Sequence, residues 1–247
     1  MPPGVAQPLL LGLLAPWSSP ALPPIPALVA RAGWNAVWLH PGESWPSVAE
    51  TMGIRVGWVI DAATTPPAGG AAVWVHPNVV GSVPAEQIAA LRASTPGTHE
   101  ISADARDVSS AKAITAAGGL PVFGAAGLDV LIDLLGSFAG RAAVYLPASP
   151  GRTETEAHAR LAGDPALAAA ARAASGLVGT LEQCQQTVAA LRAAGMSELR
   201  VRLPATADLP DVIAQVSALR GDALAGLHPG APRSPDPSAP AAWGGRA

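Results

Sequence analysis

Eight short apolar runs recur along this chain of 247 residues, and segments with helical periodicity or a high content of Pro and Gly separate them. Apolar strands that alternate with helices are typical of a parallel sheet with crossover connections. Eight such units in about 250 residues match the count and length of a (β/α)8 barrel. The sequence therefore predicts the α/β class and a compact, TIM-barrel-like (β/α)8 fold, although a doubly wound open sheet would give a similar series. The runs are residues 9–14, 35–40, 54–60, 71–76, 99–103, 120–123, 141–146 and 198–203.

The middle of the chain departs from this alternation. Residues 61–70 contain Pro66-Pro67 and Gly69-Gly70 and carry no helical pattern. A loop there would let the runs on either side pair antiparallel, or it would replace a helix lost from a longer ancestor. The predicted barrel therefore has an irregular middle portion.

The segments between the other runs predict helices with recognisable ends. Asp107 is placed to cap one helix, and Thr180-Leu181-Glu182-Gln183 reads as a capping box for another. The alanine-rich helices between residues 153 and 174 carry little large apolar surface, which predicts a position on the outside or in a lid. The predicted helices span residues 25–32, 84–92, 107–117, 128–138, 153–161, 165–174, 181–195 and 208–219, with one or two turns within 46–52.

Composition limits the class of protein. With 49% hydrophobic and 13% charged residues, the chain can bury a barrel-sized core, so we expect one domain over residues 1–227. The Pro-, Gly-, Ser- and Ala-rich residues 228–247 are expected to be a disordered tail. A net charge of −3 and a single lysine, Lys112, argue against a nucleic-acid partner. The single cysteine, Cys184, excludes an internal disulfide and fits a reducing cytoplasm.

The apolar residues 9–14 are better read as a buried strand than as the core of a signal peptide. No Lys or Arg precedes them, and a proline-rich stretch follows where a cleavage site would stand. No segment approaches the roughly 20 apolar residues of a membrane span. We therefore expect a soluble, cytoplasmic protein without a membrane partner.

The turn between the run 120–123 and the following helix has the shape of an anion site. It consists of Gly124, Ala125, Ala126 and Gly127, so backbone N–H groups and the positive end of the helix dipole are open to a phosphate. The alternative is a tight turn of the kind found in any α/β protein. Arg202 is a further anion ligand if the leucines around it pack on helices, because it would then point into the barrel near its mouth. Alternatively, Arg200 and Arg202 both face water.

Two histidines end similar runs, Trp38-Leu39-His40 and Trp74-Val75-His76, and a proline follows each. In a barrel the active site lies at the carboxyl ends of the strands, where both histidines would stand. Either side chain could donate a hydrogen bond or relay a proton, or it could be a loop histidine satisfied by backbone. A metal site would need His40, His76 and Asp61 or Asp104, but no close ligand spacing supports it, and we predict none.

Five of the seven tryptophans lie between residues 34 and 74, where they could form core or stack on a planar ligand. Nucleophilic catalysis is not indicated, because no G-x-S-x-G turn occurs and Cys184 falls on an inward helical face.

Several stretches together resemble the bacterial luciferase-like oxidoreductases, which use flavin or the deazaflavin F420. Gly119-Leu-Pro-Val-Phe-Gly-Ala-Ala-Gly127, its helix and the strand Ala142-Ala-Val-Tyr-Leu146 are similar to that family's phosphate loop, helix and strand. Residues 151–157, 177–183 and 194–199 resemble its C-terminal part, and residues 32–39 resemble its second strand more weakly. The matching segments cover roughly half of the chain.

The resemblance implies an oxidoreductase or monooxygenase that acts on a small organic substrate with FMN or coenzyme F420. It places the cofactor's phosphate at Gly124–Gly127. From their positions at strand ends, Arg202 is a further candidate ligand, and His40 or His76 would lie near the ring as catalytic residues. The chain departs from the family in its middle, where the usual leucine-aspartate helix and Ser-Gly-Gly-Arg turn are missing between Ile60 and Ala103. The alternative is a shortened, non-catalytic member that acts as a binding or partner subunit, and a homodimer is compatible with either function.

Overall fold

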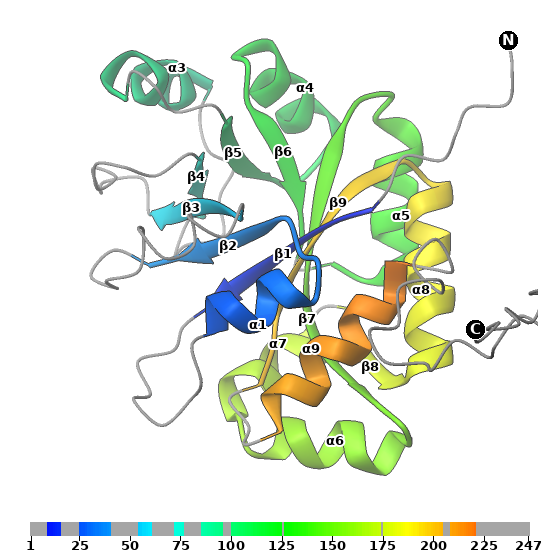
Figure 1. Ribbon diagram of the computed structural model, residues 1–247. Helices are drawn as coiled ribbons and strands as arrows, with labels where there is room; N and C mark the ends of the chain where they lie inside the picture. The colour runs from blue at the N-terminus through cyan, green and yellow to red at the C-terminus, as the bar shows by residue number, and fades with distance from the viewer. Residues whose placement is uncertain are drawn as a thin grey trace, which may run out of the picture.

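The computed structural model describes residues 9–15, 25–40, 54–60, 72–76, 85–95, 100–124, 126–173, 175–204 and 208–220. Within these ranges eight parallel strands form a closed barrel (Figure 1). They run in the order β1, β2, β3, β4, β5, β6, β7 and β9, and β9 pairs back with β1. The strands are β1 (Leu10–Ala15), β2 (Ala36–Leu39), β3 (Arg55–Ile60), β4 (Ala72–Val75), β5 (Glu100–Ala105), β6 (Leu120–Phe123), β7 (Ala142–Gly151) and β9 (Met196–Arg202).

The pairing of β6 with β7 closes the ring, which confirms a barrel over the open-sheet alternative. All eight predicted strands are present. β3 and β4 pair in parallel, so the antiparallel alternative for the middle of the chain is wrong. The sequence prediction missed β8 (Leu177–Thr180), which pairs with the far half of β7 beyond the barrel.

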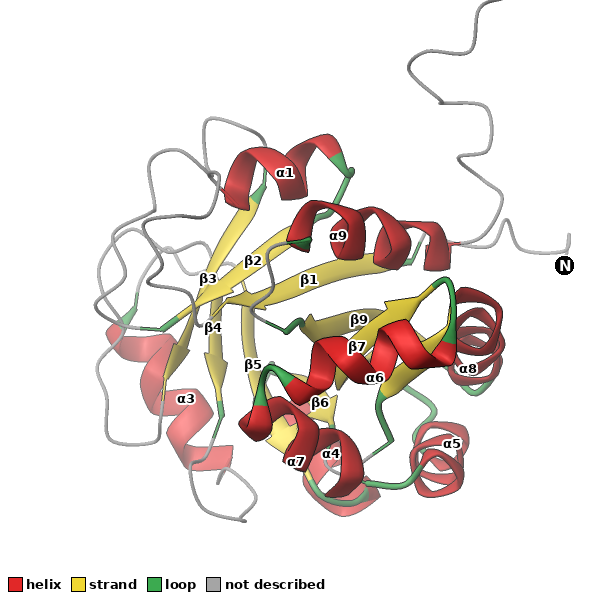
Figure 2. Cartoon of the chain, turned by 90° about the horizontal axis from the view of Figure 1, so that it is seen from below, coloured by secondary structure: helices red, strands yellow, loops and turns green. Residues whose placement is uncertain are grey.

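Helices surround the ring of strands (Figure 2). Because each parallel strand must return to the same end of the barrel, a helix follows most of the strands. They are α1 (Ile25–Arg31), α3 (Ala85–Ser94), α4 (Val108–Ala116), α5 (Leu128–Ser137), α6 (Glu154–Ala162), α7 (Pro165–Ala173), α8 (Leu181–Ala193) and α9 (Leu209–Ser217), with the 3-10 turn η1 (Ala218–Arg220) at the end. None of the described helices is long and apolar enough to cross a membrane.

The helix ends follow the predicted capping chemistry. The Asp107 side chain accepts a 2.7 Å hydrogen bond from the Ser110 amide, and Thr180 and Gln183 form the reciprocal box at the start of α8. The alanine-rich α6 and α7 lie at the bottom of the view in Figure 1, where both pack on β7 and α6 also packs on β8. The helix predicted within residues 46–52 and the tail at 228–247 fall outside the described residues.

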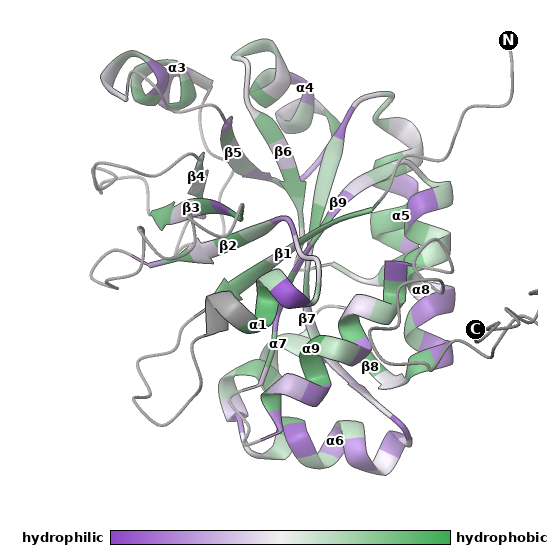
Figure 3. Ribbon diagram, in the orientation of Figure 1, coloured by the Kyte–Doolittle hydropathy of each residue, from purple (hydrophilic) through white to green (hydrophobic). Residues whose placement is uncertain are grey.

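The strands separate two apolar cores, because successive side chains point to opposite faces. The larger core lies between strands and helices and contains residues such as Leu11, Val37 and Leu199. The smaller core fills the barrel itself, with Trp38, Trp74 and Val122 among its members. Figure 3 shows the resulting green strands and the purple patches on the outer helices.

Two glycines make room for Trp38 inside the barrel. A Cβ at Gly12 would lie 2.9 Å from the indole Nε1, and one at Gly57 would overlap the indole ring. The guanidinium of Arg200 stacks over Trp38 at 3.9 Å from the ring centroid and lies 5.0 Å from that of Trp74. The indoles and Arg200 therefore fill the middle of the barrel. Cation–π stacking is strongest when the cation is desolvated, as the fully buried Arg200 is.

Below this layer, an ion network fills the end of the barrel where the strands begin. Arg200 is fully buried and donates to Glu198 at 2.7 Å and to Glu100 at 3.2 Å, while Arg55 bridges the same two carboxylates. Burial alone would raise the pKa of Glu198, but the charges of Arg200 and Arg55 outweigh it and lower this pKa. These partners are what a buried charge requires, and they correct the alternative in which Arg200 faces water.

Candidate active site at the mouth of the barrel

Five polar side chains come together where the strands end. His40 follows β2, His76 follows β4, Asp104 is in β5, Tyr145 is in β7, and Arg202 is the last residue of β9. This end of a barrel carries the active site in enzymes of this fold.

The closest interaction at the mouth joins His76 to Asp104. The two atoms His76 Nδ1 and Asp104 Oδ2 are 2.6 Å apart, and the indole Nε1 of Trp74 donates to the other carboxylate oxygen at 2.8 Å. Burial alone would lower the pKa of His76, but the hydrogen bond and the negative charge of Asp104 outweigh it and raise this pKa. His76 is therefore biased toward the imidazolium form.

A second pair of interacting side chains, Tyr145 and Arg202, lies on the other side of the mouth. Tyr145 hydrogen-bonds Arg202, and burial raises the pKa of its phenol to about 12 although Arg202 opposes the shift. The ring of Tyr145 makes an edge contact with that of His76, with 5.8 Å between the centroids. Arg202 also lies 3.9 Å from the carboxylate of Asp164, which precedes α7. Tyr145 thus stays protonated at physiological pH and connects His76 to Arg202.

His40 completes the mouth at the rim. Partial burial lowers the pKa of His40, and repulsion from His76 and Arg202 lowers it further. The two histidines are therefore electrostatically coupled and shifted in opposite directions. A site that separates the pKa values of two like groups has one acid and one base available at the same pH.

The floor of this site is closed. Trp38 and Trp74 are fully buried, and their rings meet edge-on with 5.8 Å between centroids. Trp34 and Trp58 are buried in the outer core. These four tryptophans are core residues, as one of the two interpretations expected, and Trp45 lies outside the described residues. A planar ligand would have to lie above the indoles, at the level of His76, whose side chain is 34% exposed.

The predicted phosphate loop lies beside the mouth. A Cβ at Gly124 would approach the carbonyl oxygen of Tyr145 to 3.1 Å, so the loop packs directly on β7. Gly127 is the N-cap of α5, no side chain caps that helix, and a Cβ there would meet no atom within 4 Å. The Ala126 carbonyl accepts from the Ser175 amide, and Ala125 lies outside the described residues. The start of α5 is thus open on the side of Gly127.

Sequence reasoning placed the histidines and Arg202 at strand ends, and the structure brings them together. The inward orientation of Arg202, one of two alternatives, is the observed one, since Leu199, Val201 and Leu203 pack in the outer core. What sequence reasoning missed is the pairing of His76 with Asp104, which it had considered only as metal ligands. The register of β4 and β5 aligns Trp74 with Ser102, so the residues two positions further along, His76 and Asp104, lie side by side.

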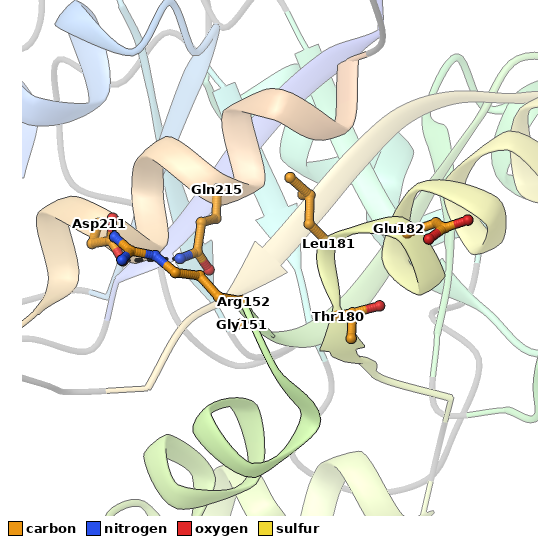
Figure 4. A pocket seen from close by; sticks show the side chains of 7 residues that line it. All are labelled: Gly151, Arg152, Thr180, Leu181, Glu182, Asp211 and Gln215. Carbon is orange, nitrogen blue, oxygen red and sulfur yellow. Dashed lines mark hydrogen bonds and ion pairs between the residues drawn. The ribbon is translucent and has the colours of Figure 1, made fainter.

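An open pocket of about 490 Å³ lies away from the mouth, between the ends of β7 and β8 and helix α9 (Figure 4). The first residues of α8 form one wall, and Arg152 reaches across to Asp211, 3.6 Å away. None of its lining residues was predicted as a site. They are Gly151, Arg152, Thr180, Leu181, Glu182, Asp211 and Gln215.

Next to this pocket, three carboxylates surround a buried arginine. Arg160 binds Asp208 and Glu156 at 2.6 Å each and Asp211 at 3.3 Å, and it also donates to the Pro150 carbonyl. The three acidic residues are close enough together to hold a cation, but all three already bind the guanidinium of Arg160. This cluster fastens α6 and α9 to the end of β7.

No family model matches the chain, and no curated protein matches it in sequence. Solved structures do match. The coenzyme F420-dependent tetrahydromethanopterin reductase from Methanopyrus kandleri superimposes with a TM-score of 0.59 at 13% identity, over 85% of this chain and 97% of that one. An F420-dependent secondary alcohol dehydrogenase, solved with an F420–acetone adduct, gives 0.56 at 11% identity, over 87% and 100%.

A third match is the FMN-bound oxygenating constituent of 3,6-diketocamphane monooxygenase from Pseudomonas putida. Its TM-score is 0.52 at 13% identity, over 85% of this chain and 96% of that one. The chain shares its fold with these F420-dependent and FMN-bound proteins. The resemblance seen in the sequence is thus confirmed at the level of the fold, and the chain spans nearly the full length of each of the three structures.

Proposed function

We propose that the protein binds FMN or F420 at the mouth of the barrel and catalyses an oxidoreductase or monooxygenase reaction on a small organic molecule. The observation that carries the proposal is the convergence of His76, Asp104, Tyr145 and Arg202 at the carboxyl ends of the strands, beside an uncapped helix start at Gly127. Neighbours of the same fold use these two cofactors.

The residues at the mouth fit such a group. The phosphate would be held by the free amides at the start of α5, where Gly127 leaves space and the helix dipole favours an anion. Arg202 adds a positive charge at the mouth, and the buried indoles below exclude water from one side of a planar ring. Bound FMN or F420 would supply the hydride or oxygen chemistry.

The protein's own residues would orient the substrate and handle protons. His76 is the candidate donor, since Asp104 favours its charged form, and His40 is the candidate acceptor, since its lowered pKa favours the neutral form. Tyr145 would act as a neutral hydrogen-bond donor or acceptor. General acid–base assistance of this kind contributes roughly 10²–10⁴-fold to a reaction rate.

Titration of the full-length protein with FMN and with F420 tests the proposal, with cofactor fluorescence as the readout. We expect micromolar or tighter affinity for one of them. Riboflavin, which lacks the phosphate, is the matched control and should bind more weakly than FMN. No change in fluorescence with either cofactor would refute the proposal.

The second candidate is a binding or partner subunit without turnover. The missing family segment between Ile60 and Ala103 favours it. Cofactor uptake without oxidation or reduction of any substrate in a panel of ketones, alcohols and aldehydes would favour this candidate, as would co-purification with a catalytic subunit.

A further inference from the structure

We propose that Asp104 is a positioning residue that holds His76 as the proton donor of the mouth. The chemistry rests on the proposed function, whereas the pairing itself is a property of the protein without cofactor. The substrates that need such a donor are those on which reduction leaves negative charge on an oxygen, such as a carbonyl compound.

The contacts of Asp104 carry the positioning role. Its two carboxylate oxygens are engaged by two donors on the neighbouring strand, Trp74 Nε1 at 2.8 Å and His76 Nδ1 at 2.6 Å. Both donors are fixed in turn, since Trp74 is fully buried and its ring lies 5.3 Å from that of His76. A carboxylate held in this way fixes the orientation of the imidazole and stabilises its charged form.

This pairing decides which nitrogen of His76 can react. Nδ1 is hydrogen-bonded to Asp104, which leaves Nε2 for a substrate. The His76 side chain is partly exposed and accessible from the mouth. In the step we propose, the Nε2–H bond breaks, and the proton joins the substrate oxygen. His76 is left neutral and Asp104 remains a carboxylate. Reduced FMN or F420 would supply the hydride, which carries both electrons to the carbonyl carbon as the C=O π bond opens.

The groups around His76 and around His40 explain why the pKa values of the two histidines shift in opposite directions. Trp74 and Tyr145 are uncharged neighbours on β4 and β7, whereas Asp104 on β5 is the negative partner. His40 after β2 instead feels the positive charges of His76 and of Arg202 on β9. The carboxylate beside His76 and the positive charges near His40 therefore shift the pKa values of the two histidines in opposite directions.

Nuclear magnetic resonance titration of the histidine ring protons of the cofactor-free protein tests the pairing. His76→Gln and His40→Gln assign the resonances. In the wild-type protein we expect the pKa of His76 above the ordinary value of 6.5 and that of His40 below it. In Asp104→Asn, which keeps an acceptor but loses the charge, the pKa of His76 should fall to or below 6.5, because the negative charge that opposes the effect of burial is gone.

Asp164→Asn is the matched control, since it removes another mouth carboxylate, one that lies near Arg202. It should leave the pKa of His76 unchanged. Circular dichroism must report the wild-type fold for both variants. If Asp104→Asn unfolds, Asp104→Glu takes its place, and it should keep part of the upward shift in the pKa of His76. A wild-type His76 that titrates at or below 6.5, or one that does not respond to Asp104→Asn, overturns the inference.

Kinetics then separate this inference from the proposed function. If the cofactor binds, Asp104→Asn and His76→Gln should lower kcat for carbonyl reduction by at least about tenfold at saturating cofactor. An unaltered kcat refutes the role as proton donor. Failure of cofactor uptake alongside the expected titration rejects the proposed function and with it the proton-transfer step, while the pairing stands.

Discussion

Replacing Gly127 by Asp tests whether a phosphate binds at the start of α5, because the substitution adds a negative charge there without disturbing the fold. Gly127 has φ −62° and ψ 155°, a conformation that any residue adopts, and a Cβ there meets no atom within 4 Å. Gly124 is a poorer choice for the same test, because its Cβ would press on the Tyr145 carbonyl. Aspartate is also a preferred N-cap residue, so we expect Gly127→Asp to raise the stability of the fold by a few tenths of a kcal/mol.

The expected loss of affinity follows from Coulomb's law. A carboxylate at Gly127 would lie roughly 5 Å from a phosphate bound to the amides at the start of α5. With an effective dielectric constant of about 20–40, two unit charges at this distance repel by about 1.5–3 kcal/mol. Since about 1.4 kcal/mol corresponds to a factor of ten, FMN should bind roughly 10- to 150-fold more weakly to Gly127→Asp.

The assay compares Gly127→Asp with Gly127→Asn, which has the same size and capping ability but no charge. Fluorescence titration should give at least a tenfold weaker dissociation constant for the Asp variant, a ratio that shrinks as salt is raised from about 20 mM to about 0.5 M. Riboflavin should bind both variants alike. Equal FMN affinities of two folded variants would refute the reasoning, because the phosphate would then lie elsewhere.

Two predictions concern the fold that carries the site. Gly57→Ala should lower the free energy of unfolding by about 1–3 kcal/mol, since its Cβ overlaps the Trp38 ring. Gly136→Ala, in open space on α5, should raise the free energy of unfolding by up to about 1 kcal/mol. Denaturant unfolding measures both variants, and equal effects would contradict the packing of Trp38. Arg160→Met should destabilise the protein by about 2–4 kcal/mol because three carboxylates lose their common partner, and an unchanged melting temperature would contradict that role.

The sequence predicted the barrel because its strands are buried on both faces and so appear as short continuous apolar runs. Helix caps were equally predictable, since Asp107 and Thr180 act on residues only three positions away. β8 was missed because its four residues, Leu177–Thr180, merge into the capping box that follows and pair only with the part of β7 beyond the barrel.

The pairing of His76 with Asp104 depends on two strands meeting in one register, and the two residues are 28 positions apart. A signal was nonetheless present. Trp74 and His76 alternate with Val75, as Ser102 and Asp104 alternate with Ala103, which places both polar ends on the inner face. The burial of Arg200 had only a partial local signal, because Glu198 lies two residues away on β9 but Glu100 and Ser102 come from β5, about a hundred residues earlier.

Backbone amide shifts on FMN binding test the central claim most directly, because they locate the phosphate among the free N–H groups of the protein. In a 15N-labelled sample, FMN and not riboflavin should shift the amides of Gly127, Leu128 and Asp129 at the start of α5. Shifts confined to Thr180, Leu181 and Glu182, at the pocket beside α8, would contradict the account and place the anion site there.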